Sequence, residues 1–190
     1  MTGSDDRPRT GDLPRLAFAI LAVGLPAGLL AIHRDLGHQG DMRVFLDWYL
    51  AASGSGTIYS SDSGINYPIV GVTCVFLPAW IVEAVTGSTI TFEAYRTALK
   101  IVLTASEAGL ILVLAPLAGS LGIRRPRIFA VATWILPATW AGGSWFGQID
   151  VVGSLWLVAA ALGATRAALA WADGRRGTGW SALAACCLAG

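Results

Sequence analysis

Residues 97–118, TALKIVLTASEAGLILVLAPLA, decide the fold, because they form an apolar run long enough to cross a membrane as a helix. Such a crossing takes about 20 residues. Further apolar runs cover residues 16–32, 67–85, 128–140 and 149–169. Hydrophobic residues make up 55% of the chain and charged residues only 13%, against roughly a quarter in a typical soluble domain. The sequence therefore predicts an all-α, polytopic transmembrane protein.

The charged residues cluster between the apolar runs, and the formal net charge of +1 gives no reason to expect a nucleic-acid partner. Residues 1–15 are polar and contain several arginines, which predicts a disordered tail that stays in the cytoplasm. A secretory signal peptide has a similar layout, but no small-x-small cleavage site follows the first run. The first helix is thus predicted to run outward, and residues 33–66 form the first external loop of the domain 16–190.

Two arginine clusters, at 124–127 and 175–176, leave two topologies open. If every apolar run crosses once, residues 124–127 lie outside, against the tendency of Arg and Lys to stay in the cytoplasm. If residues 67–85 instead enter and return on the external side, both clusters fall inside and Asp150 falls outside. We favour the second arrangement because it agrees with the charge distribution.

The external loop contains a predicted amphipathic helix in the membrane interface. Arg43, Asp47 and Ser53 fall off its apolar stripe, which recurs at helical spacing and consists of Met42, Phe45, Leu46, Tyr49 and Leu50. Asp41 begins this helix. It can cap the first free N–H groups, or it can act as a general base that takes a proton from a hydroxyl group at the membrane surface.

Three ionisable residues of the central run predict a polar site inside the membrane. Glu107 lies near its middle, and Lys100 and Arg96 precede it on roughly the same helix face. Ionisable groups within a bilayer are costly and usually face a cavity or a partner. One interpretation is a structural ion pair. The other is a site in which Arg96 and Lys100, near the outer face in the favoured topology, hold a lipid phosphate.

Residues 142–150 are rich in glycine and predict a break between two helices, ending in Gln148 and Asp150. Irregular backbone at membrane depth is tolerated only where protein or water lines it. Asp150 can also cap the following helix. Because broken helices with polar ends mark solute sites in carriers, a transporter or flippase with its site at 142–150 is an alternative function. A non-catalytic membrane subunit is a third.

The cysteines and the C-terminal run add two expectations. Cys74, Cys186 and Cys187 all lie in apolar segments, where cysteine behaves as a small hydrophobe, so neither a disulfide nor a metal site is predicted. The run 180–190 is too short to span. We therefore expect the N-terminal part of a longer polypeptide, truncated at its C-terminus and inactive by itself.

Several short motifs, in order along the chain, resemble the GT-C glycosyltransferases. Residues 40–47 (GDMRVFLD), 58–59 (IY) and 66–68 (NYP) are similar to their first external loop. In that loop an acidic residue follows the first helix, an aromatic-rich amphipathic helix comes next, and a Tyr-Pro-Pro-like motif opens the following helix. Residues 145–150 (WFGQID) resemble a Trp-Gly-Gln-x-Asp segment of bacterial members. The likeness is to actinobacterial polyprenyl-phosphomannose-dependent mannosyltransferases and to GPI mannosyltransferases.

This resemblance implies an inverting hexosyltransferase of the plasma membrane with its active site on the external face. The donor would be a polyprenyl-phosphate sugar, with mannose as the expected hexose, and the acceptor a lipid or glycan. It leaves open whether a divalent metal assists. Asp41 would be the catalytic base. The expected substrate-binding residues are Asp47, Tyr67, Arg96, Lys100, Gln148 and Asp150.

Overall fold

The computed structural model describes residues 11–33, 39–55, 69–141 and 149–189. Within these ranges the chain is helical, with turns and no strand, which confirms the predicted all-α class. The helices are α1 (Arg15–His33), α2 (Gln39–Ser55), α3 (Ile69–Thr86), α4 (Phe92–Ser120), α5 (Pro126–Ile135), α6 (Pro137–Trp140), α7 (Asp150–Ala172) and α8 (Thr178–Ala189).

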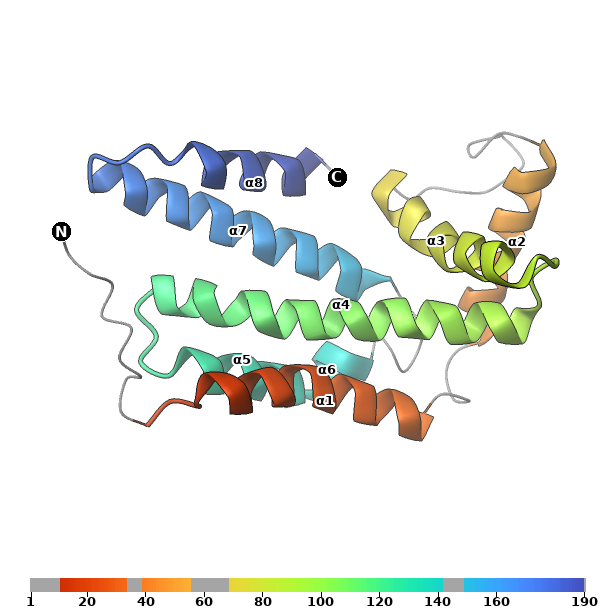
Figure 1. The fold of residues 1–190 in the computed structure, drawn as a ribbon, viewed down its shortest axis with the longest axis horizontal. Helices are drawn as coiled ribbons and strands as arrows, with labels where there is room; N and C mark the ends of the chain where they lie inside the picture. The colour runs from red at the N-terminus through yellow and green to blue at the C-terminus, as the bar shows by residue number, and fades with distance from the viewer. Residues whose placement is uncertain (1–10, 34–38, 56–68, 142–148, 190) are drawn as a thin grey trace.

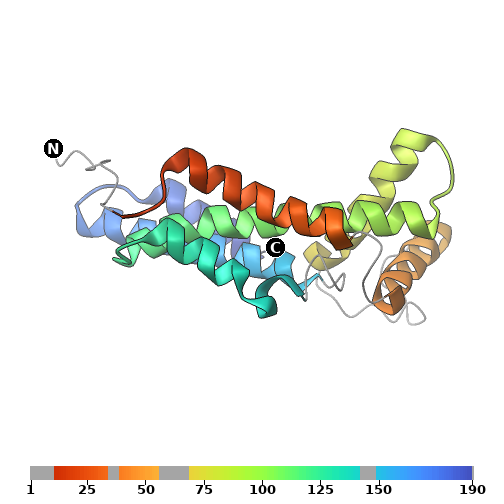
Figure 2. The same ribbon diagram turned by 90° about the horizontal axis from the view of Figure 1, so that it is seen from below.

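Helix α4 forms the axis of an elongated bundle. Helices α7 and α8 lie along one side of it, whereas α1, α5 and α6 lie along the other (Figure 1). Helices α2 and α3 pack together at the end where α4 begins, as the view from below also shows (Figure 2). Thr91 defines this start, since its hydroxyl oxygen accepts a hydrogen bond from Ala94 N at 3.3 Å and thereby caps the helix.

Among the described helices, α1, α4 and α7 are long and apolar enough to cross a membrane. We refer to them as candidate spans. Helix α8 and most of α3 are also apolar but shorter. Large apolar side chains remain exposed along the bundle, including Leu16 and Ile32 at the two ends of α1. Such exposure is unusual in soluble monomers, and lipid chains would cover it, so the fold indicates a membrane protein.

Two apolar cores hold the bundle together. The first joins α2, α3, the first half of α4 and the start of α7, and its buried members include Met42, Phe76, Tyr95, Leu99 and Val152. The second joins α1, the later half of α4 and α5 through Phe18, Ala22, Ile111, Ala130 and Trp134. Helix α4 contributes to both cores, which explains why one long helix organises the whole arrangement.

The predicted apolar stripe of the external loop forms one face of α2. Four of its five residues are buried, whereas Leu50 is exposed. Helices α3 and α4 cover this face, since the buried side chains belong to the first core. The covering surface is therefore largely protein, and not the lipid interface that the sequence predicted. The sequence could not show this difference because α3 folds back over α2 through tertiary contacts.

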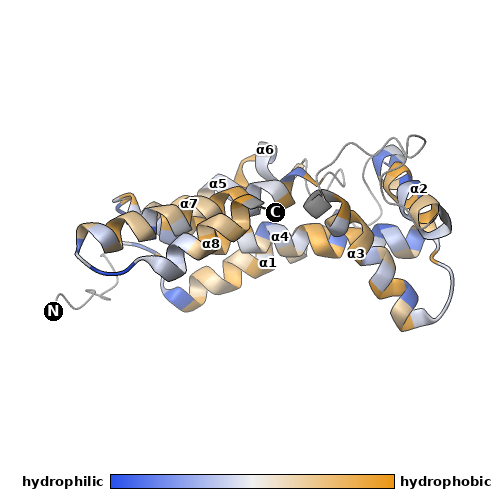
Figure 3. Ribbon diagram, turned by 90° about the horizontal axis from the view of Figure 1, so that it is seen from above, coloured by the Kyte–Doolittle hydropathy of each residue, from blue (hydrophilic) through white to orange (hydrophobic). Residues whose placement is uncertain are grey.

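The start of α1, the α4–α5 connection and the α7–α8 connection all lie at one end of the bundle (Figures 1 and 2). We call this the basic end, because Arg15 and both arginine clusters, 124–127 and 175–176, belong to these segments. The hydropathy colouring shows polar segments there beside mostly apolar helices (Figure 3). This geometry agrees with the second of the two predicted topologies, in which the arginines at the start of α1 and both clusters share a side.

The apolar run 128–140 is interrupted in the structure. Helix α5 ends at Ile135, and α6 begins at Pro137 after the extended residue Leu136, whose φ is −62° and ψ is 127°. Proline has no N–H to donate and disfavours a helical conformation at the residue before it. The 10 residues of α5 are too few to cross a hydrocarbon core, so this run does not form a fourth span of regular helix.

Candidate functional site

A polar stripe runs along one face of α4. Arg96, Lys100 and Glu107 are buried, with 9%, 0% and 0% of their surfaces exposed, and Thr104 lies between them. Residues three and four apart lie on the same side of a helix, so the predicted common face is confirmed. The stripe lies within a candidate span, where ionisable groups mark functional sites by default.

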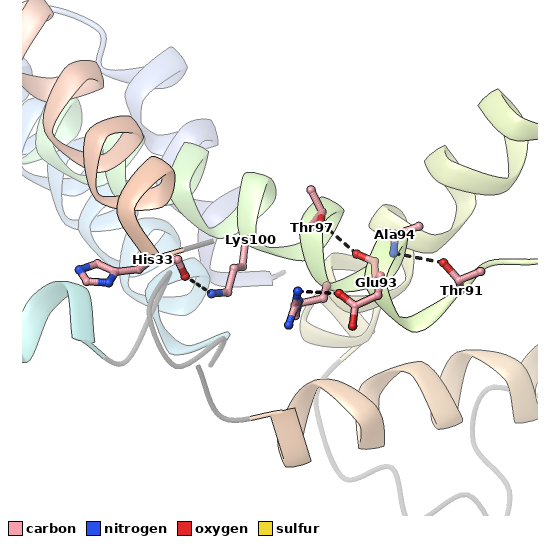
Figure 4. Close-up of polar contacts among 7 residues, drawn as sticks. His33, Thr91, Glu93, Ala94, Thr97 and Lys100 are labelled. Carbon is pink, nitrogen blue, oxygen red and sulfur yellow. Dashed lines mark hydrogen bonds and ion pairs between the residues drawn. The ribbon is translucent and has the colours of Figure 1, made fainter. Parts of the chain in front are cut away.

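Lys100 joins this stripe to the end of α1. Its Nζ donates a hydrogen bond to the backbone carbonyl oxygen of His33 at 2.7 Å (Figure 4). His33 is the last residue of α1, and the final carbonyls of a helix have no partner within the helix. The helix dipole also favours a cation at this end. The ammonium group of Lys100 is therefore held at the junction of two candidate spans.

Arg96 lies one turn before Lys100 and forms an ion pair with Glu93 across 2.5 Å (Figure 4). The arginine side chain is 11% exposed and the glutamate side chain 67% exposed. Glu93 thus reaches toward the surface while the guanidinium group stays inside. Because the pair is only partly covered, it contributes little stability on its own, and its main effect is to hold the guanidinium group near the start of α4.

Glu107 lies two turns beyond Lys100 and accepts a hydrogen bond from Trp134 Nε1 at 3.2 Å. Arg96 thus pairs with Glu93, a residue outside the ion pair considered from the sequence, and Glu107 accepts from an indole on α5. The Trp134 side chain is buried, with 6% exposed. The stripe therefore connects α4 to α1 at Lys100 and to α5 at Glu107.

A hollow of about 200 Å³ adjoins Lys100 between α1 and α4 and is lined by Ala27, Leu30, Ala31, Thr97, Lys100 and Ile101. Its lining is apolar except for Lys100 and Thr97, and the Thr97 hydroxyl donates to the backbone oxygen of Glu93 at 2.9 Å. Both walls belong to candidate spans. The arrangement is a cationic group beside an apolar space between two candidate spans.

The predicted catalytic base, Asp41, is half-buried in the first turn of α2. Its neighbour Met42 belongs to the same core as Tyr95, and the Arg43 guanidinium lies 4.7 Å from the centre of the Phe92 ring. The start of α2 is thus fixed beside the start of α4. Asp41 is the third residue of α2, and a carboxylate in the first turn of a helix interacts favourably with the helix dipole.

The other predicted substrate-binding residues are spread over two helices. Asp47 is exposed on α2, and Asp150 is exposed in the first turn of α7. The cap position of α7 is Ile149, so Asp150 is the first residue of this helix and not its cap. Tyr67, Gln148 and the break that begins at residue 142 lie outside the described residues.

Sequence reasoning missed three parts of this site: the carbonyl of His33, the partner of Arg96, and the indole of Trp134. The i, i+3 spacing of Glu93 and Arg96 is a signal that could have identified their pair. The other two contacts join residues 67 and 27 positions apart. No local pattern identifies such partners, because they meet only when the helices pack.

In the part of the chain that the structure describes, no three side chains of His, Cys, Asp or Glu lie together in a way that could hold a metal ion. Comparisons with protein-family models, with curated proteins and with solved structures found no match for this chain. Its function therefore has to be argued from the chemistry of its own residues.

Proposed function

We propose that this protein is an integral membrane glycosyltransferase that moves a hexose from a polyprenyl-phosphate donor to a lipid or glycan hydroxyl group. Mannose is the expected sugar, and the reaction is placed at the external face of the plasma membrane. The observation that supports it best is Lys100, a buried cation beside an apolar hollow between two candidate spans. A polyprenyl phosphate has the matching chemistry, an anion at the end of an apolar chain.

Two cationic side chains of α4 would bind the phosphate of the donor. The ammonium group of Lys100 would neutralise the charge that develops on the phosphate as the sugar leaves, since lysine binds phosphate as a compact point charge. Arg96 lies one turn earlier on the same face. Its guanidinium group, held by Glu93, supplies a second positive charge near the start of α4. Such charges are strongest where water is excluded.

Asp41 would act as the general base. Its carboxylate takes the proton of the acceptor hydroxyl as that oxygen forms a bond to the anomeric carbon of the sugar. The bond between the anomeric carbon and the phosphate oxygen breaks at the same time, and its electron pair leaves with the polyprenyl phosphate. One displacement inverts the anomeric carbon and needs no covalent enzyme intermediate. The fixed position of α2 beside the start of α4 supports this role.

The remaining polar residues would contact the sugar and the acceptor. We assign hydrogen bonds with sugar hydroxyl groups to Asp47 and Asp150, and to Gln148 from the end of the glycine-rich segment. Tyr67 would position the acceptor. The exposure of Asp47 and Asp150 supports contact with a ligand, because neither carboxylate is enclosed by the protein.

Transfer of labelled sugar from a polyprenyl-phosphate donor, measured in membranes that carry the full-length protein, tests the assignment of Asp41. Asp41→Asn should lower the rate by a factor of about 100 or more, the usual scale for a general base. Asp173→Asn is the matched control, since Asp173 is exposed and lies at the basic end. Full activity of Asp41→Asn at equal expression would contradict the assignment.

The phosphate-binding role of Lys100 needs a separate test, because removing a buried contact also affects folding. Lys100→Arg keeps a cation within reach of the His33 carbonyl, whereas Lys100→Met keeps only the length of the chain. We expect the arginine variant to retain more transfer than the methionine variant at equal unfolding temperature. Equal activity of the two variants, with both folded, would exclude a requirement for positive charge at this position.

The discontinuity between α5 and α6 favours a second candidate, a transporter or flippase. Short helices that end inside the membrane region are typical of solute sites, and α5 also places Trp134 against the buried carboxylate of Glu107. Proteoliposomes with a fluorescent polyprenyl-phosphate lipid separate the two functions. Protein-dependent movement of the lipid between leaflets without sugar transfer would favour the carrier, and transfer without movement would favour the enzyme.

A further inference from the structure

The basic end of the bundle carries more positive charge than its own acidic residues balance. Its described arginines are Arg15, Arg124, Arg125, Arg127, Arg175 and Arg176, and its described acids are Asp12 and Asp173. Arg124, Arg125, Arg175 and Arg176 are all exposed. Two of these exposed side chains come from the α4–α5 connection and two from the α7–α8 connection, and both connections lie at the same end of the bundle (Figure 1).

Several of these groups already have partners within the protein. Arg175 forms an ion pair with Asp173 at 2.6 Å, and Arg127 donates to the backbone oxygen of Leu13 at 2.6 Å. Asp12 accepts from the backbone N–H of Ile128 at 3.2 Å, at the start of α5. The carboxylates of Asp12 and Asp173 therefore already have partners within the protein.

Three arginines remain available to an external anion. In the described part of the chain, the side chains of Arg124, Arg125 and Arg176 form no hydrogen bond or ion pair with another residue. The C-terminal ends of α4 and α7 lie here, and so do the N-terminal ends of α1, α5 and α8. Each helix end carries only about half a charge, negative at a C-terminus and positive at an N-terminus. The helix dipoles therefore do not cancel the positive charge of the arginines.

The surroundings of these arginines indicate a membrane surface. The chain leaves two candidate spans at this end, and apolar side chains lie next to the charged ones. Leu121 and Trp171 are 66% and 63% exposed, which suits the boundary between hydrocarbon and headgroups, where tryptophan is enriched. Guanidinium groups bind phosphate oxygens in pairs of parallel hydrogen bonds.

We propose that the basic end is a binding surface for the headgroups of anionic phospholipids. Arg124, Arg125 and Arg176 would contact the phosphates, and Leu121 and Trp171 would rest among the upper parts of the acyl chains. The surface lies at the opposite end of the bundle from the start of α4, where Arg96 is paired with Glu93. It depends only on the insertion of the bundle in a membrane and not on the proposed sugar transfer.

The test compares lipid binding by the purified full chain in mixed micelles. The probes are phosphatidylglycerol and phosphatidylcholine, and the bound lipids are counted by native mass spectrometry. We expect preferential binding of phosphatidylglycerol, weakened by salt. The variant with Arg124→Gln, Arg125→Gln and Arg176→Gln together should bind it on the order of a hundredfold less tightly, since each arginine near an anionic surface contributes about fivefold. Arg43→Gln, an exposed arginine on α2, should bind it as the unmodified protein does.

The unfolding temperature without phosphatidylglycerol shows whether the triple variant is folded. A folded triple variant that binds phosphatidylglycerol with unchanged affinity would overturn the proposal. If the triple variant does not fold, the test rests on the unmodified protein. Equal affinity of that protein for the two lipids would overturn the proposal, and so would a preference for phosphatidylglycerol that salt does not reduce.

Discussion

Trp134 donates a hydrogen bond from its indole Nε1 to Oε2 of Glu107 across 3.2 Å, between α5 and the middle of α4. Both side chains are buried. The carboxylate lies in a candidate span, where an unsatisfied polar group is costly. The indole also packs in the second core with Ala130 and Ile111. One side chain thus satisfies a buried acid and fills apolar space, which makes α5 dependent on α4 for its position.

Trp134→Phe should lower the free energy of unfolding by about 1–3 kcal/mol, because it removes a donor from a buried acceptor. The measurement is thermal or denaturant unfolding of the purified protein in detergent. Trp171→Phe is the matched control, since that tryptophan is 63% exposed, and it should have little effect. Equal destabilisation by the two substitutions would show that the hydrogen bond to Glu107 does not stabilise the fold.

Two glycines of α7 should respond oppositely to the same substitution. A Cβ at Gly163 would lie 2.9 Å from Ala184 N and from Trp180 O on α8, whereas a Cβ at Gly153 would meet nothing within 4 Å. Gly163→Ala should therefore push α8 away and destabilise the protein. Gly153→Ala should be neutral or stabilise it by about 0.5–1 kcal/mol, since alanine favours a helix over glycine. Unfolding temperatures test the pair.

Thiol labelling of the α8 cysteines reports whether a substitution at Gly163 displaces α8. Cys187 is buried and Cys186 is exposed. In the unmodified protein a thiol reagent should label Cys186 quickly and Cys187 slowly. Displacement of α8 by Gly163→Val should raise the labelling rate of Cys187, measured by mass spectrometry of the labelled peptide, while Gly153→Val should leave it unchanged. Unchanged labelling in both variants would mean that α7 and α8 tolerate the added side chain.

Tyr49 should make the contact between α2 and α3 sensitive to alkaline pH. Its hydroxyl donates a hydrogen bond to Glu83, and the second oxygen of Glu83 accepts from Ile90 N at 3.4 Å. Burial, followed by the hydrogen bond to Glu83, raises the pKa of Tyr49 above its usual 10.0. In the unfolded chain the phenol would then ionise at a lower pH than in the folded protein.

The stabilising effect of Tyr49 is complete below the unfolded pKa and declines as the pH rises through the higher folded pKa. We therefore expect the unfolding temperature to fall above about pH 10. Tyr49→Phe, which cannot ionise, should show a smaller fall over the same range, although it begins from a lower value. A parallel decline in both proteins would assign the alkaline sensitivity to other groups.

The proposed sidedness predicts opposite labelling of the two ends of the bundle. With the native cysteines replaced by alanine, Ser88→Cys places a thiol in the α3–α4 connection and Arg176→Cys places one at the basic end. An impermeant thiol reagent applied to intact cells should label the first site only. The second should react after the membrane is permeabilised. Labelling of both sites in intact cells would contradict the arrangement in which residues 67–85 do not cross.

Composition and apolar run length were enough to predict helices and candidate spans, since both depend on local residue content. The runs 16–32, 97–118 and 149–169 correspond to α1, α4 and α7, with α4 beginning earlier than predicted because Thr91 caps it. Pro137 divides the run 128–140, and its missing N–H was a readable signal. Helical spacing also predicted the common face of Arg96, Lys100 and Glu107.

Partners across the bundle depended on the tertiary structure. Lys100 meets the carbonyl of His33, and Glu107 meets Trp134, only because α1 and α5 pack along α4. The sequence left two topologies open, and in the folded bundle both arginine clusters lie at the end where α1 begins (Figure 1). Periodicity indicates which face of a helix is apolar, but not which surface covers that face. The covering surface is determined by burial of apolar area and by pairing of polar groups between distant segments. Both are properties of the assembled bundle.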